Sequence, residues 1–153
     1  MNLPPFQDLL DLHGREVHRF LVATVGRTEA DDAYQETWLA ALRAYPRLRD
    51  AGNLRGWLFT IAHRKAVDHF RQRRRVTTIA GELPETPVED DHRDEGEVWA
   101  VVRQLPHKQR TAVALRYVLD ADYSLISAAM GTSEEAARRN VFEGLKRLRR
   151  EYE

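Results

Sequence analysis

The 153-residue sequence contains no cysteine, which excludes disulfide bonds, thiolate metal sites and cysteine nucleophiles. No apolar run approaches the roughly 18 residues that a membrane-spanning helix needs, and the first residues lack the basic and apolar segments of a secretory signal. The chain also lacks net charge, because 24 Lys and Arg residues balance 24 Asp and Glu residues. We therefore expect a soluble, globular, cytoplasmic protein, and the neutral total argues at first against a generic polyanion binder.

Sequence patterns typical of catalysis are missing as well. The six histidines form no His-x-x-x-His pair, and neither a Gly-rich phosphate loop nor a Gly-x-Ser-x-Gly motif occurs. Many carboxylates gather in a stretch rich in Pro and Gly, where nothing would hold them rigidly. We expect a protein that is not an enzyme and that uses no metal, no cofactor and no small-molecule substrate.

The charge is distributed unevenly along the chain. Residues 53–75 hold seven basic residues against one acidic residue, whereas 76–97 hold eight acidic residues against one basic residue. The acidic stretch cannot bury enough apolar area to offset its ordering entropy, so it is interpreted as a flexible linker. The predicted organisation is an N-terminal domain over 1–75, an acidic linker over 76–94 and a C-terminal domain over 95–153. A further hypothesis is that the linker screens the basic surface of the free protein.

Apolar residues outside the linker recur with helical spacing, which predicts an all-α fold of two small domains. A capping box is predicted at Thr28 and an N-cap at Asn53. The predicted helices begin near residues 6, 28, 53, 98 and 109. The buried stripe predicted for the second helix consists of Tyr34, Trp38, Ala41, Leu42 and Tyr45. Each domain is small enough to be marginally stable unless it docks on something.

The C-terminal residues predict a helix-turn-helix. A short helix over 123–130 is followed by the turn Gly131-Thr132-Ser133 and by a longer helix from Glu134 to about Arg150. Ser133 is a suitable N-cap for the second helix. In this motif the second helix enters the major groove of DNA. The inward stripe of that helix is predicted to be Ala137, Val141, Leu145 and Leu148, which leaves most of its basic residues outside.

Four stretches resemble family motifs in the expected order. Residues 30–39 read ADDAYQETWL, 53–71 read NLRGWLFTIAHRKAVDHFR, 105–117 begin LPHKQR and end LRY, and 131–149 form the second part of the helix-turn-helix. Together they resemble an extracytoplasmic-function (group 4) sigma factor of the sigma-70 family. The resemblance implies transcription initiation: a subunit that binds the RNA polymerase core at its β′ clamp and β flap, reads −10 and −35 promoter elements, melts the −10 region, and is held inactive by an anti-sigma factor.

The resemblance also implies three sets of site residues. Expected to bind core polymerase are Asp31, Asp32, Gln35, Glu36 and Leu39. Expected to bind −10 DNA, duplex or single-stranded, are Asn53, Arg55, His63, Arg64, Lys65, His69, Arg71, Arg73, Arg74 and Arg75. Expected to bind −35 DNA are Ser133, Glu134, Arg138, Arg139, Asn140 and Lys146.

The recognition helix departs from the family pattern, because Asn140 and Glu143 occupy positions that are usually basic. Asn140 is suited to reading adenine, whereas Glu143 would repel phosphate or accept a hydrogen bond from cytosine. Two alternatives therefore stay open. One is a stand-alone helix-turn-helix regulator that binds duplex DNA without polymerase, and the other is an interaction protein with the sigma fold and a drifted −35 surface.

Overall fold

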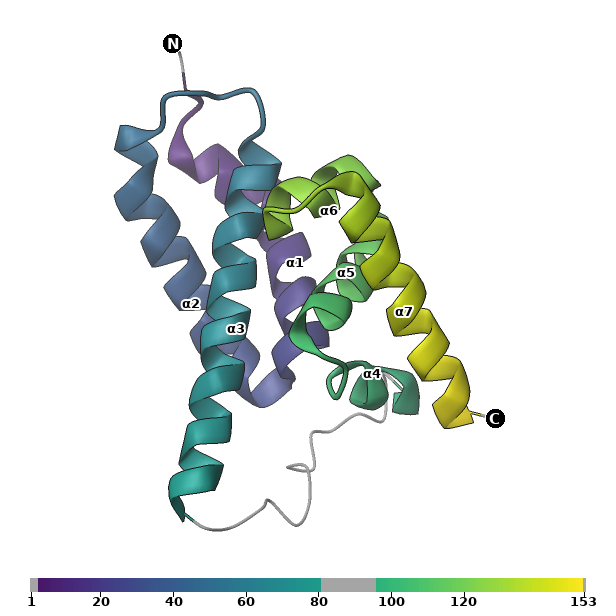
Figure 1. The fold of residues 1–153 in the computed structure, drawn as a ribbon. Coiled ribbons are helices and arrows are strands. Elements are labelled where there is room, and N and C mark those ends of the chain that lie inside the picture. Colours follow the sequence, from purple (N-terminus) through teal and green to yellow (C-terminus); the bar gives the residue numbers. More distant parts are fainter. Residues whose placement is uncertain (1–2, 81–95, 153) are drawn as a thin grey trace.

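The computed structural model describes residues 3–80 and 96–152, and these residues are helical apart from short connections. The predicted all-α class is confirmed for this part of the chain (Figure 1). The elements are α1 (Phe6–Val25), α2 (Arg27–Ala44), the 3₁₀ turn η1 (Tyr45–Arg47), α3 (Leu54–Ala80), α4 (Gly96–Val102), α5 (His107–Val118), α6 (Tyr123–Met130) and α7 (Glu134–Tyr152). The expected screening role of the acidic linker concerns residues 81–95, which lie outside the described residues.

The connection between α1 and α2 is a single residue, Gly26. Its backbone has a φ of 86°, a conformation that glycine adopts without the steric cost of a side chain. Its amide donates to the Val22 carbonyl, and its own carbonyl accepts from the Ala30 amide, so one residue ends α1 and begins α2. The capping box predicted at Thr28 is therefore wrong: α2 already begins at Arg27 and has no side-chain cap.

The predicted cap at Asn53 is confirmed, since its Oδ1 accepts a hydrogen bond from the Gly56 amide at 3.0 Å. From there α3 continues through the basic block to Ala80, into residues that composition assigns to the linker. No Gly or Pro interrupts 76–80, and the next helix breaker in the sequence is Gly81. The helix thus extends beyond residue 75, the boundary predicted from charge alone.

Aromatic side chains organise the core of the N-terminal unit, α1–α3. Phe6 packs edge-on against Trp38 and Tyr45, with ring centroids 5.7 and 5.2 Å apart. Phe20 meets Phe59 of α3 in the same way at 5.7 Å. These contacts join α1 to α2 and to α3. Edge-to-face pairs stabilise such a junction in addition to the free energy gained from burial.

The C-terminal unit, α4–α7, contains the predicted helix-turn-helix. Asp122 caps α6 by accepting from the Leu125 amide at 2.8 Å, and Gly131 ends α6 in the left-handed conformation. The predicted cap of α7 is confirmed, because the Ser133 Oγ accepts from the Ala136 amide at 3.1 Å. A small apolar cluster joins α4, α5 and α7 and consists of Val102, Leu105, Val113 and Leu148.

The two units pack directly against each other. Helix α6 lies against α3, and α5 lies against α1, so the halves of the chain form one body (Figure 1). A single buried apolar cluster includes Leu58 and Phe59 of α3 together with Leu115 and Ile126 of the C-terminal unit. At its edge the Thr60 hydroxyl donates to the Ala128 carbonyl at 3.2 Å. Docking thus gives each small unit the apolar partner that its size requires.

A substitution at Gly144 tests the packing of α7 on α5. A Cβ atom there would lie 2.7 Å from Val113 Cγ2, so the Val113 side chain or one of the two helices must shift. We expect Gly144→Ala to lower the free energy of unfolding by about 1–3 kcal/mol, the usual cost of overpacking, as measured by urea denaturation. Gly52→Ala is the control, since its Cβ would meet only the flexible Asp50 side chain. Equal stability of the two variants would contradict the close approach of α5 and α7.

Candidate functional site

One side of α2 presents carboxylates beside apolar side chains. Asp31, Asp32, Gln35 and Glu36 are exposed, and Leu39 exposes 51% of its surface. Trp38, in contrast, is buried in the core and is 7% exposed. Sequence reasoning missed Leu42, which was placed in the buried stripe but is also 51% exposed. Its spacing of three residues from Leu39 was the available signal. We call the surface formed by Asp31, Asp32, Gln35, Glu36, Leu39 and Leu42 the α2 face.

Two carboxylates of the α2 face already have partners within the chain. Asp31 lies 3.2 Å from the Nε2 of His18 in α1. Glu36 lies 2.6 Å from the Nε2 of His69 in α3, while Glu29 lies 2.8 Å from the Nδ1 of the same ring. His69 therefore joins α3 to two positions of α2 that lie about two helical turns apart. We call this arrangement the Glu29–His69–Glu36 clasp.

The clasp changes the acidity of its histidine. Burial alone would lower the pKa of His69, but the hydrogen bonds and charges of Glu29 and Glu36 outweigh it and raise the pKa above the usual value. A doubly protonated imidazole donates from both nitrogens, which is what two flanking carboxylates require. His69, predicted to contact −10 DNA, is thus committed to the α2 face in this structure.

The other −10 candidates on α3 differ in exposure and in their contacts with the rest of the chain. Exposed on α3 are Arg64, Arg71, Arg73 and Arg75. Lys65 is half-buried, and the side chain of Arg74 lies outside the described residues. Arg55 forms a two-pronged ion pair with Glu16 of α1, at 3.1 Å from Nε and 3.0 Å from Nη2. Asn53 serves as the helix cap. The structure therefore gathers Arg64, Arg71, Arg73 and Arg75 on one helix and turns Arg55 toward α1.

His63 lies in the interface between the units. Its Nδ1 is 3.0 Å from the Thr111 hydroxyl of α5, and its ring centroid is 6.3 Å from that of His107. Burial, followed by the nearby charges of His107, Arg110 and Arg64, lowers the pKa of His63 to about 4. Burial and neighbouring cations lower the pKa of His107 too. Both imidazoles are therefore neutral at pH 7, and α5 covers the His63 position of α3.

Arg110 is the largest buried side chain of the interface and is 1% exposed. Its guanidinium carbon stands 4.0 Å from the centroid of the Phe70 ring in α3, and its Nη1 donates to the Arg103 carbonyl at 3.1 Å. Its Nε is buried without a hydrogen-bond partner, and no carboxylate among the described residues pairs with it. Burial lowers the pKa of Arg110 to about 10, so a positive charge stays enclosed at pH 7.

The candidate −35 residues lie on α7, at the outer edge of the molecule (Figure 1). Ser133, Glu134, Arg138, Arg139 and Lys146 are exposed, and Asn140 is half-buried. Sequence reasoning missed Phe142, an aromatic side chain that is 63% exposed. The signal was its position, because 142 falls outside the inward stripe and one turn after Arg138 and Arg139. An exposed ring one turn from two cations adds an apolar group to the same stretch of α7.

Comparison with known proteins identifies both halves of the chain. The family model for sigma-70 region 2 matches residues 9–76, and that for sigma-70 region 4 matches residues 95–148. RNA polymerase sigma factor CarQ of Myxococcus xanthus is 30% identical over 151 residues, which cover 94% of this chain and 87% of CarQ. The chain belongs to the extracytoplasmic-function sigma factors of the sigma-70 family. Its helix-turn-helix is the region 4 domain, and a sigma factor is a non-catalytic subunit of the polymerase holoenzyme.

Other relatives agree with this family. The sigma factor SigC of Mycobacterium tuberculosis is 33% identical over 123 residues, and the match spans 76% of this chain but only 66% of the length of SigC. Among solved structures, the sigma factor RpoE in complex with the anti-sigma factor NepR, from Bartonella quintana, has the same fold, with a TM-score of 0.78 over 97% of this chain and 96% of RpoE, at 23% identity. CnrH in complex with the cytosolic domain of CnrY has a TM-score of 0.71 over 94% of this chain and 84% of CnrH, at 22% identity.

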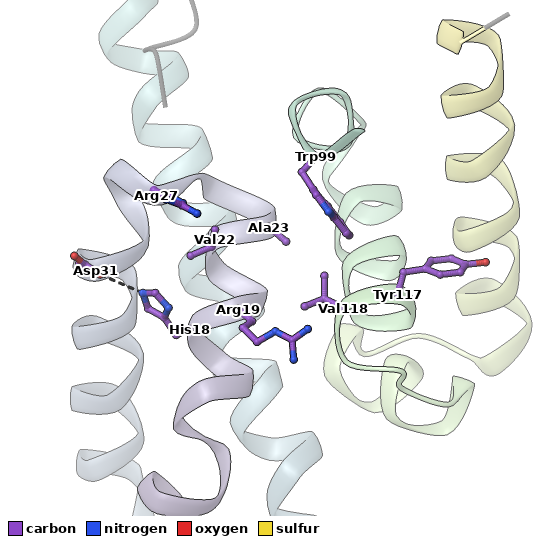
Figure 2. A pocket seen from close by; sticks show the side chains of 9 residues that line it. All are labelled: His18, Arg19, Val22, Ala23, Arg27, Asp31, Trp99, Tyr117 and Val118. Carbon is purple, nitrogen blue, oxygen red and sulfur yellow. Dashed lines mark hydrogen bonds and ion pairs between the residues drawn. The ribbon is translucent and has the colours of Figure 1, made fainter. Parts of the chain in front are cut away.

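The sigma factor has a cleft between its two units (Figure 2). Its volume is about 670 Å³. Trp99 and Val118 form one wall, and Arg19 of α1 reaches across toward them (Figure 2). The other lining residues are His18, Val22, Ala23, Arg27, Asp31 and Tyr117.

In the described ranges, none of the helices combines the length and the apolar character that a membrane span needs.

Acidification should separate the two units of the sigma factor. The pKa of His63 is about 4 in the packed form and returns toward 6.5 once the ring is exposed. Below pH 6.5 His63 is therefore protonated in the separated form but stays neutral in the packed form. The free energy that favours packing falls by ~1.4 kcal/mol per pH unit until pH 4. We expect the radius of gyration from small-angle X-ray scattering to rise between pH 7.5 and 5. His63→Asn should reduce this rise, and an undiminished rise would assign the effect to other groups.

The Glu29–His69–Glu36 clasp predicts the opposite sign for His69. Because its folded pKa is raised, the clasp contributes its full stability below pH 6.5 and loses it as pH rises through the folded pKa. We expect the ring protons of His69 to titrate above pH 6.5 in a nuclear magnetic resonance experiment, and Glu29→Gln to lower that midpoint. Asp120→Asn, at an exposed carboxylate of the other unit, should leave it unchanged. A midpoint that ignores Glu29→Gln would exclude the clasp.

Proposed function

We propose that this sigma factor, working in the cytoplasm, binds RNA polymerase core through the α2 face and directs it to promoters whose −10 and −35 elements contact α3 and α7. The observation that carries the proposal is the placement of three motifs on three separate exposed surfaces. Acidic and apolar side chains occupy the α2 face, while arginines occupy α3 and α7. Each surface has a charge suited to a different partner.

The α2 face has the composition of a protein-binding site rather than of a solvated helix. Leu39 and Leu42 provide apolar anchors that are not needed by the core, and the acidic residues around them complement a basic partner. We assign this face to the β′ clamp. The occupant must compete with His18 and His69 for Asp31 and Glu36, since both carboxylates already have partners.

The α3 surface is suited to promoter DNA in two ways. Arg64, Arg71 and Arg75 provide cations for backbone phosphates, which bind without reading sequence. Planar groups such as His63 would hold unpaired bases by stacking. In the packed form α5 covers His63, and α6 lies along α3. Binding and melting of the −10 element therefore requires the two units to separate, and we assign that separation to assembly with polymerase.

The α7 surface is suited to duplex DNA. Arg138 and Arg139 can reach base edges or phosphates, and Phe142 offers an apolar contact for a thymine methyl group. Glu143 is half-buried, which directs less of its charge at DNA than its position in the sequence indicates. These features support −35 recognition over a drifted surface that has lost DNA binding.

We further propose that an anti-sigma factor holds the chain inactive through the cleft between the units. Of the solved neighbours named above, RpoE was determined in complex with the anti-sigma factor NepR, and CnrH in complex with the cytosolic domain of CnrY. The cleft combines an apolar wall at Trp99 with the guanidinium of Arg19, which suits a segment bearing apolar side chains and carboxylates.

A pair of leucine substitutions tests the α2 face. We expect Leu39→Ala combined with Leu42→Ala to weaken binding to polymerase core by at least tenfold, because loss of an apolar anchor costs about 1–3 kcal/mol, as measured by fluorescence anisotropy with labelled sigma factor. Leu12→Ala is the matched control, since Leu12 is 74% exposed on α1 and lies outside the α2 face. Equal affinities of the two variants would remove the α2 face from the polymerase interface.

Run-off transcription and gel shift distinguish the remaining alternatives. Purified core with this chain should give specific transcripts from a pool of linear templates randomised upstream of a transcribed cassette. The isolated chain should bind the enriched templates weakly in a gel shift and tightly only when core is added. Tight binding without core would favour a stand-alone helix-turn-helix regulator. Absence of specific transcripts would favour an interaction protein with a drifted DNA surface.

A further inference from the structure

The aromatic ring of Tyr123 is shared by two arginines from different helices. The guanidinium carbon of Arg138 in α7 lies 4.9 Å from the ring centroid, and that of Arg116 in α5 lies 5.5 Å from it. Cations within about 6 Å of an aromatic centroid are attracted by the ring quadrupole. The ring therefore links α5, the start of α6 and the exposed surface of α7.

Hydrogen bonds of the turn before α6 fix the backbone that carries the Tyr123 ring. Tyr123 is the first residue of α6, directly after the Asp122 cap. The preceding turn is closed by the Ala121 amide, which donates to the Leu115 carbonyl at 3.0 Å. Arg116 donates to the Ala121 carbonyl at 3.2 Å and pairs with Asp120 at 3.4 Å. Arg116 is thus held at the turn by backbone and carboxylate contacts, and Arg138 is the more exposed of the two arginines.

The contact matters most for Arg138 because that side chain is exposed. An exposed arginine samples many rotamers, and ordering such a side chain on binding has an entropic cost. A guanidinium that already rests on a ring has lost part of this freedom before DNA arrives. Arg139, its neighbour in sequence, makes no ring contact among the described residues. Before DNA binds, the side chain of Arg138 is therefore conformationally more restricted than that of the adjacent Arg139.

We propose that Tyr123 is a positioning residue that orients Arg138 for the −35 element and so helps determine promoter specificity. This inference rests on the proposed function of α7. Tyr123 acts through its ring, since no hydrogen bond of its hydroxyl is found among the described residues. A merely structural role is the competing explanation, because Tyr123 is half-buried and also packs against the main apolar cluster.

A double-mutant cycle separates the two explanations. The readout is the transcript yield of reconstituted holoenzyme on the template pool, sequenced to give the −35 preference. We expect Tyr123→Leu to lower yield and −35 discrimination about two- to fivefold, the fold-change of a surface cation–π contact. The same loss should appear in the Arg139→Ala background and should vanish in the Arg138→Ala background. Tyr123→Phe, which keeps the ring, should behave as the unchanged protein.

Spectroscopy gives a readout that does not depend on transcription or on the folding of Tyr123→Leu. In the unchanged chain and in Tyr123→Phe, the δ protons of Arg138 should show an upfield ring-current shift. Absence of that shift would overturn the inference. So would an equal effect of Tyr123→Leu in the Arg138→Ala and Arg139→Ala backgrounds, which is the result of a structural role. If Arg138→Ala itself leaves the −35 preference unchanged, the proposed −35 function of α7 falls as well.

Discussion

The packing of the two units against each other is the interaction on which the rest of the structure depends. It unites two small helical units around one apolar cluster, but it also encloses Arg110 over the Phe70 ring and His63 beside His107. Among the described residues Arg110 has no anion beside it, which is unfavourable for a buried cation, and a cation–π contact offsets only part of its desolvation. Apolar packing therefore stabilises the interface while the enclosed charge weakens it, in agreement with the proposed separation of the two units on DNA binding.

Neutrality of the whole chain conceals a division of charge among surfaces with different partners. Acidic residues with two leucines lie on α2, while arginines line α3 and α7. The Glu29–His69–Glu36 clasp connects the first of these surfaces to the second, so any partner that draws Glu36 away removes one of the two carboxylates that hold the His69 ring of α3. The proposed polymerase surface and the proposed DNA surface are thus coupled through one imidazole.

Local features of this fold could be predicted from the sequence, whereas contacts between distant residues could not. Helical periodicity located the elements, and the caps at Asn53 and Ser133 follow from side-chain chemistry within three residues. The capping box at Thr28 was wrong, although α2 begins within one residue of the predicted start, because Gly26 with its positive φ takes the N-cap position. Leu42 was assigned to the core because helical periodicity does not show which edge of an apolar stripe is packed against other helices. The partners of His63 and His69 are 48 and 33–40 residues away, beyond any local pattern.

Because both halves of the interface belong to one chain, their association is unimolecular. Its equilibrium does not change on dilution, in contrast to a regulator whose inactive form is a dimer. The cellular amount of this sigma factor therefore sets the number of packed molecules. It does not change the fraction of all its molecules that is packed. That fraction responds only to competitors for the buried surfaces and to the medium. The concentration of partners, rather than that of the sigma factor itself, therefore controls how often the buried surfaces are exposed.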